Sequence, residues 1–185
     1  MSVKVFTTGE VLTASDTNTF LANSGLVYVG AGTLSLTTSA TNVTGVFSST
    51  YKQYRVLLNV TARSTTSRVD WRFIDGTTPT ITGYYWGSIG GDYASNTTLY
   101  GQRSNFDNQW FGQSTAGFLS TTIDIFNANK TVATMYTGQI LDRSSGYAYS
   151  GGGVQVATTA FTGFQLFTSA GTATVEYQVF GYREA

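Results

Sequence analysis

Carboxylates are the main side chains of this chain that could do chemistry, because the sequence holds no histidine and no cysteine. That composition excludes Ser-His-Asp and Cys-His nucleophilic arrangements and the zinc sites that Cys and His build. A glycosidase needs two carboxylates in one cleft. The candidates are Asp70, Asp75, Asp92, Asp107, Asp124 and Asp142. Asp75, Asp107 and Asp142 suit turns, and Asp70 and Asp124 suit solvent faces of strands, so we expect no enzyme, no cofactor and no metal site.

A second group of candidate residues is aromatic and lies in a stretch without clear periodicity. Its members are Tyr84, Tyr85, Trp86, Trp110 and Phe111, which stand among Gly, Ser and Asn. Tyr and Trp beside small polar residues are typical of adaptable recognition surfaces. One interpretation is contact with a receptor or a host-surface glycan. The other is burial in the core or in a subunit interface, where aromatic residues are enriched.

The composition predicts an all-β protein. Charged residues make up 11% and aromatic residues 15% of the 185 residues, and Thr, Ser, Asn and Gly supply most of the polarity. Thr, Tyr, Phe and Val favour strands, whereas Gly, Asn and Ser favour turns. Lys and Arg are scattered, so the basic stripe of a nucleic-acid-binding face is missing. We recognise no signal peptide and no apolar run near the roughly 18 residues of a membrane span, which predicts synthesis in a cytoplasm without membrane insertion.

Alternating apolar and polar residues mark the strands that must position any site. The pattern predicts strands at residues 54–60, 69–73, 119–126, 131–136, 161–167 and 174–182. A further strand is predicted at residues 26–29, where Gly30-Ala31-Gly32 would break it. Residues 76–118 and 143–153 are less periodic and predict long loops or irregular strands. Roughly eight strands with short turns indicate a β-sandwich of jelly-roll type over residues 33–185.

Residues 1–32 differ from the rest and predict an attachment arm. Thr13, with Asp16 three residues later, has the spacing of a capping box at the start of a helix. We expect one short helix at about residues 15–23. A helix of this length is marginal by itself, so its apolar face must dock on another surface.

The same arm carries a recurring sequence motif. Residues 5–21 read VFTTGEVLTASDTNTFL, and a V-Y-V stretch follows at residues 27–29. This pattern resembles an N-terminal motif of tailed-bacteriophage structural proteins, and it is similar to the attachment end of fibre-type and decoration-type proteins. Residues 51–58 and 69–73 are similar to the first strands of the β-sandwich modules in such proteins.

The resemblance implies a virion location, homotrimeric assembly and anchoring through the N-terminus, and it brings no catalytic residue. The implied partners are further copies of the chain and the capsid, tail or baseplate proteins. The expected anchoring residues are Phe6, Val11, Leu12, Phe20 and Leu21. Long tail fibres have an extended shaft, for which this chain leaves no room, so we expect a short fibre, a head fibre or a capsid-decoration protein. The alternative function is a carbohydrate-binding adhesin module for a host receptor.

Overall fold

The structure is a computed structural model that describes most of the chain. The described residues are 7–11, 13, 25–92, 97–106, 109–114, 119–142 and 146–182. Within these ranges the chain forms β-strands and no helix. The short helix predicted at about residues 15–23 lies outside the described residues. In the part that is described, no helix has the length and apolar character needed to span a membrane.

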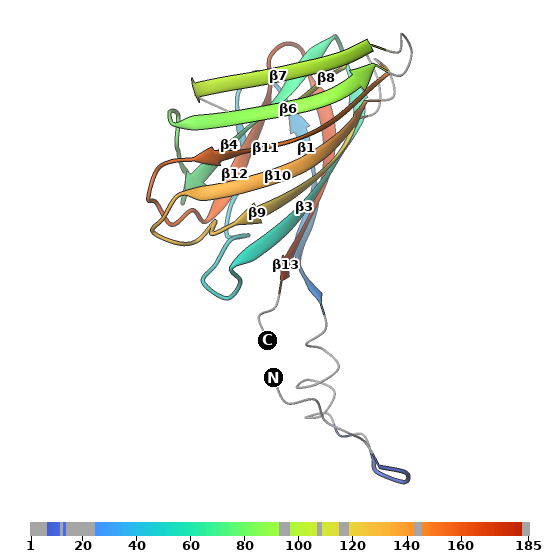
Figure 1. Cartoon of the computed structure of the whole chain (residues 1–185), viewed down its shortest axis with the longest axis vertical. Coiled ribbons are helices and arrows are strands. Elements are labelled where there is room, and N and C mark those ends of the chain that lie inside the picture. The colour runs from blue at the N-terminus through green and yellow to red at the C-terminus, as the bar shows by residue number, and fades with distance from the viewer. Residues whose placement is uncertain are drawn as a thin grey trace.

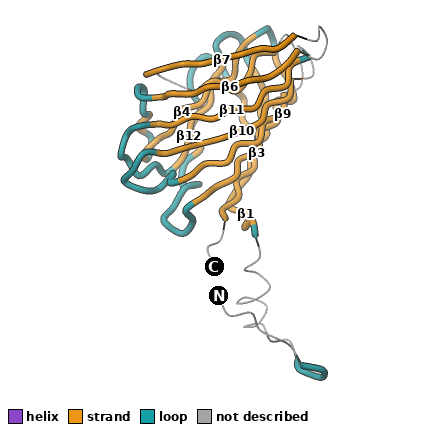
Figure 2. Tube along the Cα trace, viewed as in Figure 1, coloured by secondary structure: helices purple, strands orange, loops and turns teal. Residues whose placement is uncertain are grey.

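Thirteen strands follow one another along the described chain (Figure 1). The first seven are β1 (Leu26–Leu36), β2 (Thr41–Val43), β3 (Gln53–Arg63), β4 (Ser67–Asp75), β5 (Thr78–Pro79), β6 (Tyr84–Asp92) and β7 (Thr97–Phe106). The others are β8 (Gln109–Ser114), β9 (Leu119–Phe126), β10 (Thr134–Asp142), β11 (Tyr147–Gln155), β12 (Gly163–Thr168) and β13 (Ala173–Tyr182). Figure 2 shows that loops lie mainly where the strands end.

These strands form two antiparallel sheets that face each other as a sandwich. The large sheet has eight strands in the order β1-β13-β3-β9-β10-β11-β6-β7. The small sheet has five strands, in the order β2-β12-β4-β5 with β8 also paired to β4. The all-β sandwich predicted from the sequence is therefore confirmed, with sheets of unequal size.

Aromatic side chains from both sheets fill the space between them. In the small sheet, the rings of Trp71 and Phe164 stack with centroids 4.0 Å apart. Phe73 of the small sheet lies parallel to Tyr84 of the large sheet, at 6.3 Å between centroids and an interplanar angle of 5°. All four rings are at most 1% exposed. Burying a large apolar side chain contributes about 1.5–3 kcal/mol, so this cluster holds the two sheets together.

β1 continues through the glycines at residues 30–32, where the sequence predicted a break. Its register with β13 shifts once, just after Tyr28, which is a β-bulge. Gly32 lies opposite Tyr177, and a Cβ at this glycine would come within 2.9 Å of the Tyr177 ring. The glycine therefore marks a close side-chain contact and not the end of a strand. Because β1 begins at Leu26, it starts before the expected beginning of the sandwich domain.

The two less periodic segments form strands, which was one of their two interpretations. β5 to β8 occupy much of the first, and β11 occupies much of the second. β11 pairs with β10 on one side and β6 on the other, although it contains Gly151, Gly152 and Gly153. A Cβ at Gly151 would clash with the Gly87 carbonyl oxygen across the β11–β6 pair. Glycines interrupt the alternation of apolar and polar side chains. The sequence pattern therefore did not distinguish strands from loops in these segments.

Candidate functional site

The outer face of the large sheet, which is turned away from the small sheet, carries an open trough. The trough has a volume of about 870 Å³. It runs over six neighbouring strands, from β13 through β3, β9, β10 and β11 to β6. Its volume lies within the range of about 300–1,000 Å³ that is typical of ligand sites. We therefore treat this trough as the candidate site.

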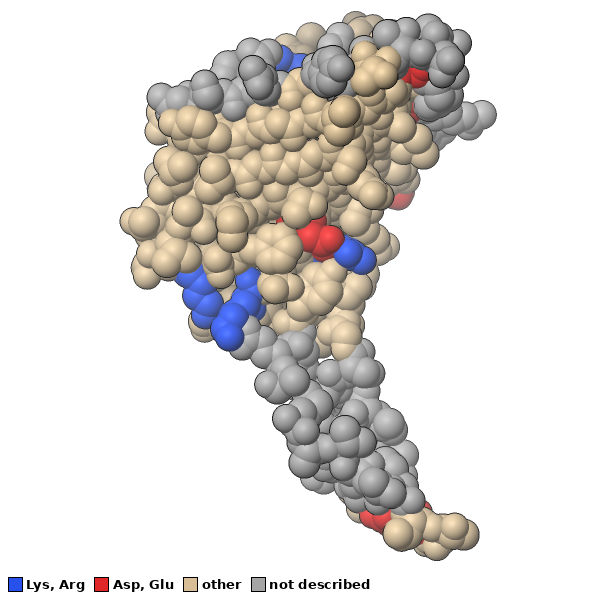
Figure 3. Space-filling model, viewed as in Figure 1, with Lys and Arg blue, Asp and Glu red and all other residues tan. Residues whose placement is uncertain are grey.

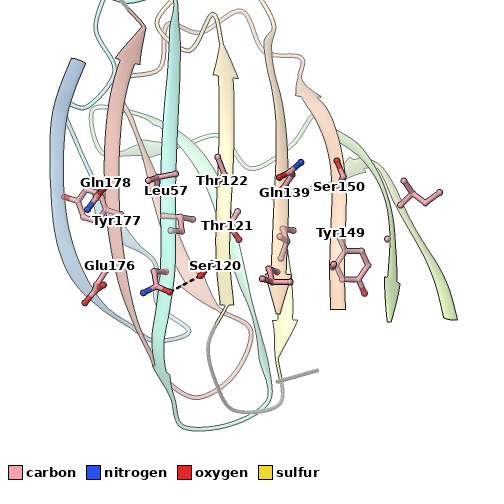
Figure 4. Close-up of a pocket in the computed structure, with 17 residues that line it drawn as sticks. Leu57, Ser120, Thr121, Thr122, Gln139, Tyr149, Ser150, Glu176, Tyr177 and Gln178 are labelled. Atoms are coloured by element: carbon pink, nitrogen blue, oxygen red, sulfur yellow. Dashed lines mark hydrogen bonds between the residues drawn. The ribbon is translucent and has the colours of Figure 1, made fainter. Parts of the chain in front are cut away.

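Strand register arranges the lining residues in three rows that cross the strands. The floor is formed by the backbone of residues at the positions of each strand that alternate toward the small sheet. These are Tyr177, Leu58, Thr121, Ile140, Tyr149 and Gly90. The first wall, here the Glu176 wall, consists of Glu176, Asn59, Ser120, Leu141 and Ala148. The second, here the Gln178 wall, consists of Gln178, Leu57, Thr122, Gln139, Ser150 and Ile89. The labelled residues of Figure 4 follow these rows across the sheet.

Sheet geometry sets the dimensions of the trough. Neighbouring strands lie about 4.8 Å apart, so six strands give a length of about 24 Å. The two walls stand two residues apart along each strand, which corresponds to about 7 Å. The site is therefore long and narrow, and it lies at right angles to the strand direction.

The walls present mainly amide and hydroxyl groups. The Ser120 hydroxyl donates a hydrogen bond to Asn59 Oδ1 over 3.2 Å, as the dashed line in Figure 4 marks. This contact leaves the Asn59 amide nitrogen as a donor for another partner. Gln139, Gln178 and Ser150 on the opposite wall are exposed. The trough can therefore both donate and accept hydrogen bonds along its length.

Charge is sparse in and around the trough. Among the described residues that line it, Glu176 is the single carboxylate and none is Lys or Arg. Leu141 and Ile89, which are 54% and 58% exposed, add aliphatic surface on opposite walls. Figure 3 shows the same side of the molecule, and most of its described surface carries no Lys, Arg, Asp or Glu. The lining therefore combines neutral polar groups with a small apolar area.

An ion pair occupies the next outward row beyond the Gln178 wall. Arg55 donates through Nε and Nη2 to the two carboxylate oxygens of Asp124, at 2.8 and 2.7 Å. The Tyr182 hydroxyl donates to the same carboxylate over 3.0 Å. Hydrogen bonds from Arg55 lower the pKa of Asp124 against the opposing effect of burial, and the Tyr182 contact lowers it further. The two charges cancel, so this row adds no net charge beside the trough.

The aspartates considered for catalysis do not meet in the trough. Asp124 lies on the outer face of β9 as predicted, and Asp75 is exposed as the last residue of β4, directly before the turn at residues 76–77. Asp92 is the last residue of β6, and Asp107 lies outside the described residues. The lining residues that are described form no two-carboxylate arrangement. No group of three or more His, Cys, Asp or Glu side chains that could hold a metal ion occurs in the described part of the chain.

Two aspartates correct the sequence prediction, because Asp70 and Asp142 are each only 1% exposed. Asp70 was expected on a solvent face. It lies in β4 between β12 and β8, directly opposite Phe167, and 3.7 Å from the Arg68 guanidinium. Asp142 was expected in a turn, yet it is buried at the end of β10, where its charge opposes the lowering of the pKa of Arg63 by burial. The burial of both carboxylates arises in the tertiary structure, which the local sequence does not reveal.

The five aromatic candidates are divided between the core and the surface. Tyr84 and Trp86 are 0% and 7% exposed and belong to the core, so the core interpretation applies to these two. Tyr85, between them in β6, points outward and is 38% exposed. Trp110 and Phe111 lie in β8, which pairs with β4, and their side chains are outside the described part.

The expected anchoring residues fall mostly outside the described structure. Val11 is described and is 79% exposed. Phe6, Leu12, Phe20 and Leu21 lie outside the described residues. Their assignment to anchoring stays a prediction from the sequence.

Sequence reasoning missed the trough. Each wall residue occupies an ordinary polar or aliphatic position in an alternating strand, and nothing local distinguishes Gln139 or Asn59 from other outward residues. The six strands that contribute are spread from residue 57 to residue 178. Only strand order and register align them, and neither is readable from local patterns.

Comparison with known proteins gives no relative for this chain. No protein-family model, no curated protein and no solved structure matches it. The N-terminal motif, the fold and the geometry of the trough are the features of this chain that bear on its function.

Proposed function

We propose that the chain is a non-enzymatic structural component of a tailed-phage virion, either a short homotrimeric fibre or a capsid-decoration protein. Its N-terminal arm would anchor it to a capsid, tail or baseplate protein, and its β-sandwich would face outward. The observation that carries the proposal is the motif at residues 5–21, which resembles the attachment end of such proteins. The confirmed all-β sandwich after this motif is consistent with the proposal.

The position where the arm joins the sandwich supports this arrangement. Leu26, the first residue of β1, pairs with Tyr182, the last described residue of β13. The start of β1 and the end of β13 lie side by side at one end of the large sheet (Figure 1). An anchor that precedes Leu26 would therefore join the sandwich at this end of the large sheet.

The low charge of the chain supports membership in an assembly. The sequence has ten cationic and ten anionic side chains, which give no net charge. Proteins without net charge have little electrostatic protection against association. A subunit that works within a trimer or on a particle tolerates this composition better than a free monomer does.

Removal of the arm tests the proposal. A variant that lacks residues 1–24 should keep the β-type circular dichroism spectrum of the purified full chain, because it retains every described strand. It should be absent from purified particles of the phage whose genome carries the chain, as measured by quantitative mass spectrometry. Full-length protein should be present. A copy number close to that of the major capsid protein would indicate decoration, and a few copies would indicate a fibre.

A point variant refines this test. Leu21→Asp places a charge on the predicted anchoring face and should reduce incorporation, whereas Thr19→Ala in the same segment should not. Particles that lack the full-length chain, or that incorporate the truncated chain normally, would contradict the proposal.

A further inference from the structure

We propose that the trough of the large sheet binds a neutral oligosaccharide that lies across the strands. Amide and hydroxyl groups of Asn59, Ser120, Thr122 and Gln139 would hydrogen-bond to ring hydroxyls. Leu141 and Ile89 would contact the apolar faces of the rings. This inference goes beyond a structural role in a virion, and it holds for the isolated chain whether or not the chain belongs to a particle.

The backbone of the trough excludes an added peptide strand as the natural occupant. Peptides that extend a sheet bind to a free edge, where main-chain groups lack partners. Each of the six strands under the trough has a neighbouring strand on both sides. Their main-chain groups are therefore engaged in the sheet, and affinity for an occupant must come from side chains.

The charges of the trough select a neutral occupant. An acidic ligand would find no Lys or Arg among the described lining residues and would meet the Glu176 carboxylate. A strongly cationic ligand would find only that one carboxylate. Complementary charge is how interfaces recognise charged partners. The charge distribution thus favours a ligand that carries hydrogen-bonding groups without net charge.

The chemistry and shape of the walls favour a sugar chain among neutral ligands. Side-chain amides and hydroxyls offer both donors and acceptors, which match groups that are themselves hydroxyls. Desolvation of such neutral groups costs far less than desolvation of charges. The length of about 24 Å suits a linear chain of several rings better than a single small molecule. The aliphatic side chains of Leu141 and Ile89 complete a surface for molecules that are polar at their edges and apolar on their faces.

Binding to defined sugars tests the inference. Purified full-length chain would be screened on an array of neutral and acidic oligosaccharides that includes maltopentaose, cellopentaose, chitopentaose and oligogalacturonate. The best neutral member would then be titrated by isothermal calorimetry. We expect binding to at least one neutral member, weakened about tenfold by Gln139→Ala, which corresponds to the loss of a hydrogen bond.

The chain offers a matched control for this substitution. Gln53→Ala removes an exposed glutamine from the same outer face, outside the trough, and should leave affinity unchanged. Amide chemical-shift changes on sugar binding should fall on β3, β9, β10 and β11 near the walls. These readouts need no particle, so a failed incorporation experiment leaves them unaffected.

Several results would overturn the inference. One is a failure to bind any neutral oligosaccharide, and another is binding to acidic oligosaccharides only. A third is an equal loss of affinity in Gln139→Ala and Gln53→Ala. A second copy seated on the trough would also overturn it. That occupant would reveal itself in light scattering, where Leu141→Arg would convert an oligomer to a monomer.

Discussion

The inner and outer faces of the large sheet are built from alternate residues of the same strands, yet their chemistry is opposite. In β3, Val56 and Leu58 point inward and are 0% and 3% exposed, whereas Leu57 and Asn59 point outward and are partly exposed. The inner face meets the aromatic cluster of the small sheet. The described part of the outer face presents amides, hydroxyls, the Arg55–Asp124 ion pair and a few exposed aliphatic side chains such as Leu141 and Ile89. Stability and recognition are thus assigned to alternate positions of each strand, so single substitutions should separate them.

Adjacent leucines give the largest expected contrast. Leu58→Ala removes a buried inner side chain and should lower the free energy of unfolding by about 2–5 kcal/mol. Leu57→Ala removes a half-buried outer side chain and should cost only about 1 kcal/mol. Urea denaturation followed by tryptophan fluorescence measures both. Equal costs would mean that the outer face is packed against something, and the distinction between the faces would fail.

Adjacent tyrosines in β6 give the second contrast. The buried Tyr84 hydroxyl accepts from the Phe73 N–H over 2.8 Å and donates to the Thr80 carbonyl over 3.1 Å. Tyr84→Phe removes this partner of the Phe73 N–H and the Thr80 carbonyl. The substitution should lower the free energy of unfolding by about 1–3 kcal/mol. Tyr85→Phe alters an exposed outward side chain and should leave the denaturation midpoint nearly unchanged. A cost for Tyr85→Phe as large as that for Tyr84→Phe would contradict the assignment of faces.

The outer ion pair should contribute less than either core contact. The side chains of Arg55 and Asp124 are 35% and 27% exposed, so solvent screening limits the pair to about 1 kcal/mol or less. Because the pKa of Asp124 is lowered in the folded state, its contribution is present above the unfolded pKa of about 3.9 and is lost as pH falls through the folded value. Unfolding of wild type and Asp124→Asn should therefore differ at neutral pH and converge in strong acid. A difference that grows on acidification would contradict this.

The trough residues should have the smallest effect on folding. Gln139→Ala and Gln53→Ala both change exposed outer side chains, so each should alter the free energy of unfolding by less than about 0.5 kcal/mol. Thermal melts measured by circular dichroism test this directly. A large loss of stability in Gln139→Ala would mean that this wall supports the fold, and the separation of stability from recognition would be wrong.

Where side chains alternate cleanly the sequence predicted strands, although the strand expected at residues 131–136 begins only at Thr134 and continues as β10 to Asp142. The strands predicted at residues 54–60, 69–73 and 174–182 correspond to β3, β4 and β13. Alternation fails where glycine replaces the side chains, which is why β6 and β11 were ambiguous. The break predicted from the glycines at residues 30–32 was wrong, because β1 continues through them and Gly32 makes room for the Tyr177 ring.

Local patterns do not contain the information that defines the site. Alternation indicates that Asn59 and Gln139 each point to the opposite side of their strand from the residues next to them in sequence. It does not indicate which strands flank them. The order β3-β9-β10 brings these two residues to the same side of one sheet. The prediction for Asp70 was wrong for the same reason, because its burial arises in the folded surroundings of β4, which pairs with β12 and β8. The surroundings of residues that depend on pairing partners far along the chain therefore could not be predicted from local sequence.

The pairing of β1 with β13 has a mechanical consequence. A pull on the residues before Leu26 enters the sheet through the first residue of β1, which pairs with the last described residue of β13. Hydrogen bonds of an antiparallel pair lie perpendicular to the strands, so a pull directed along β1 shears the β1–β13 ladder and does not peel it bond by bond. The ladder extends from Leu26 opposite Tyr182 to Leu36 opposite Ala173. A tether attached in this way distributes its load over the full length of the strand.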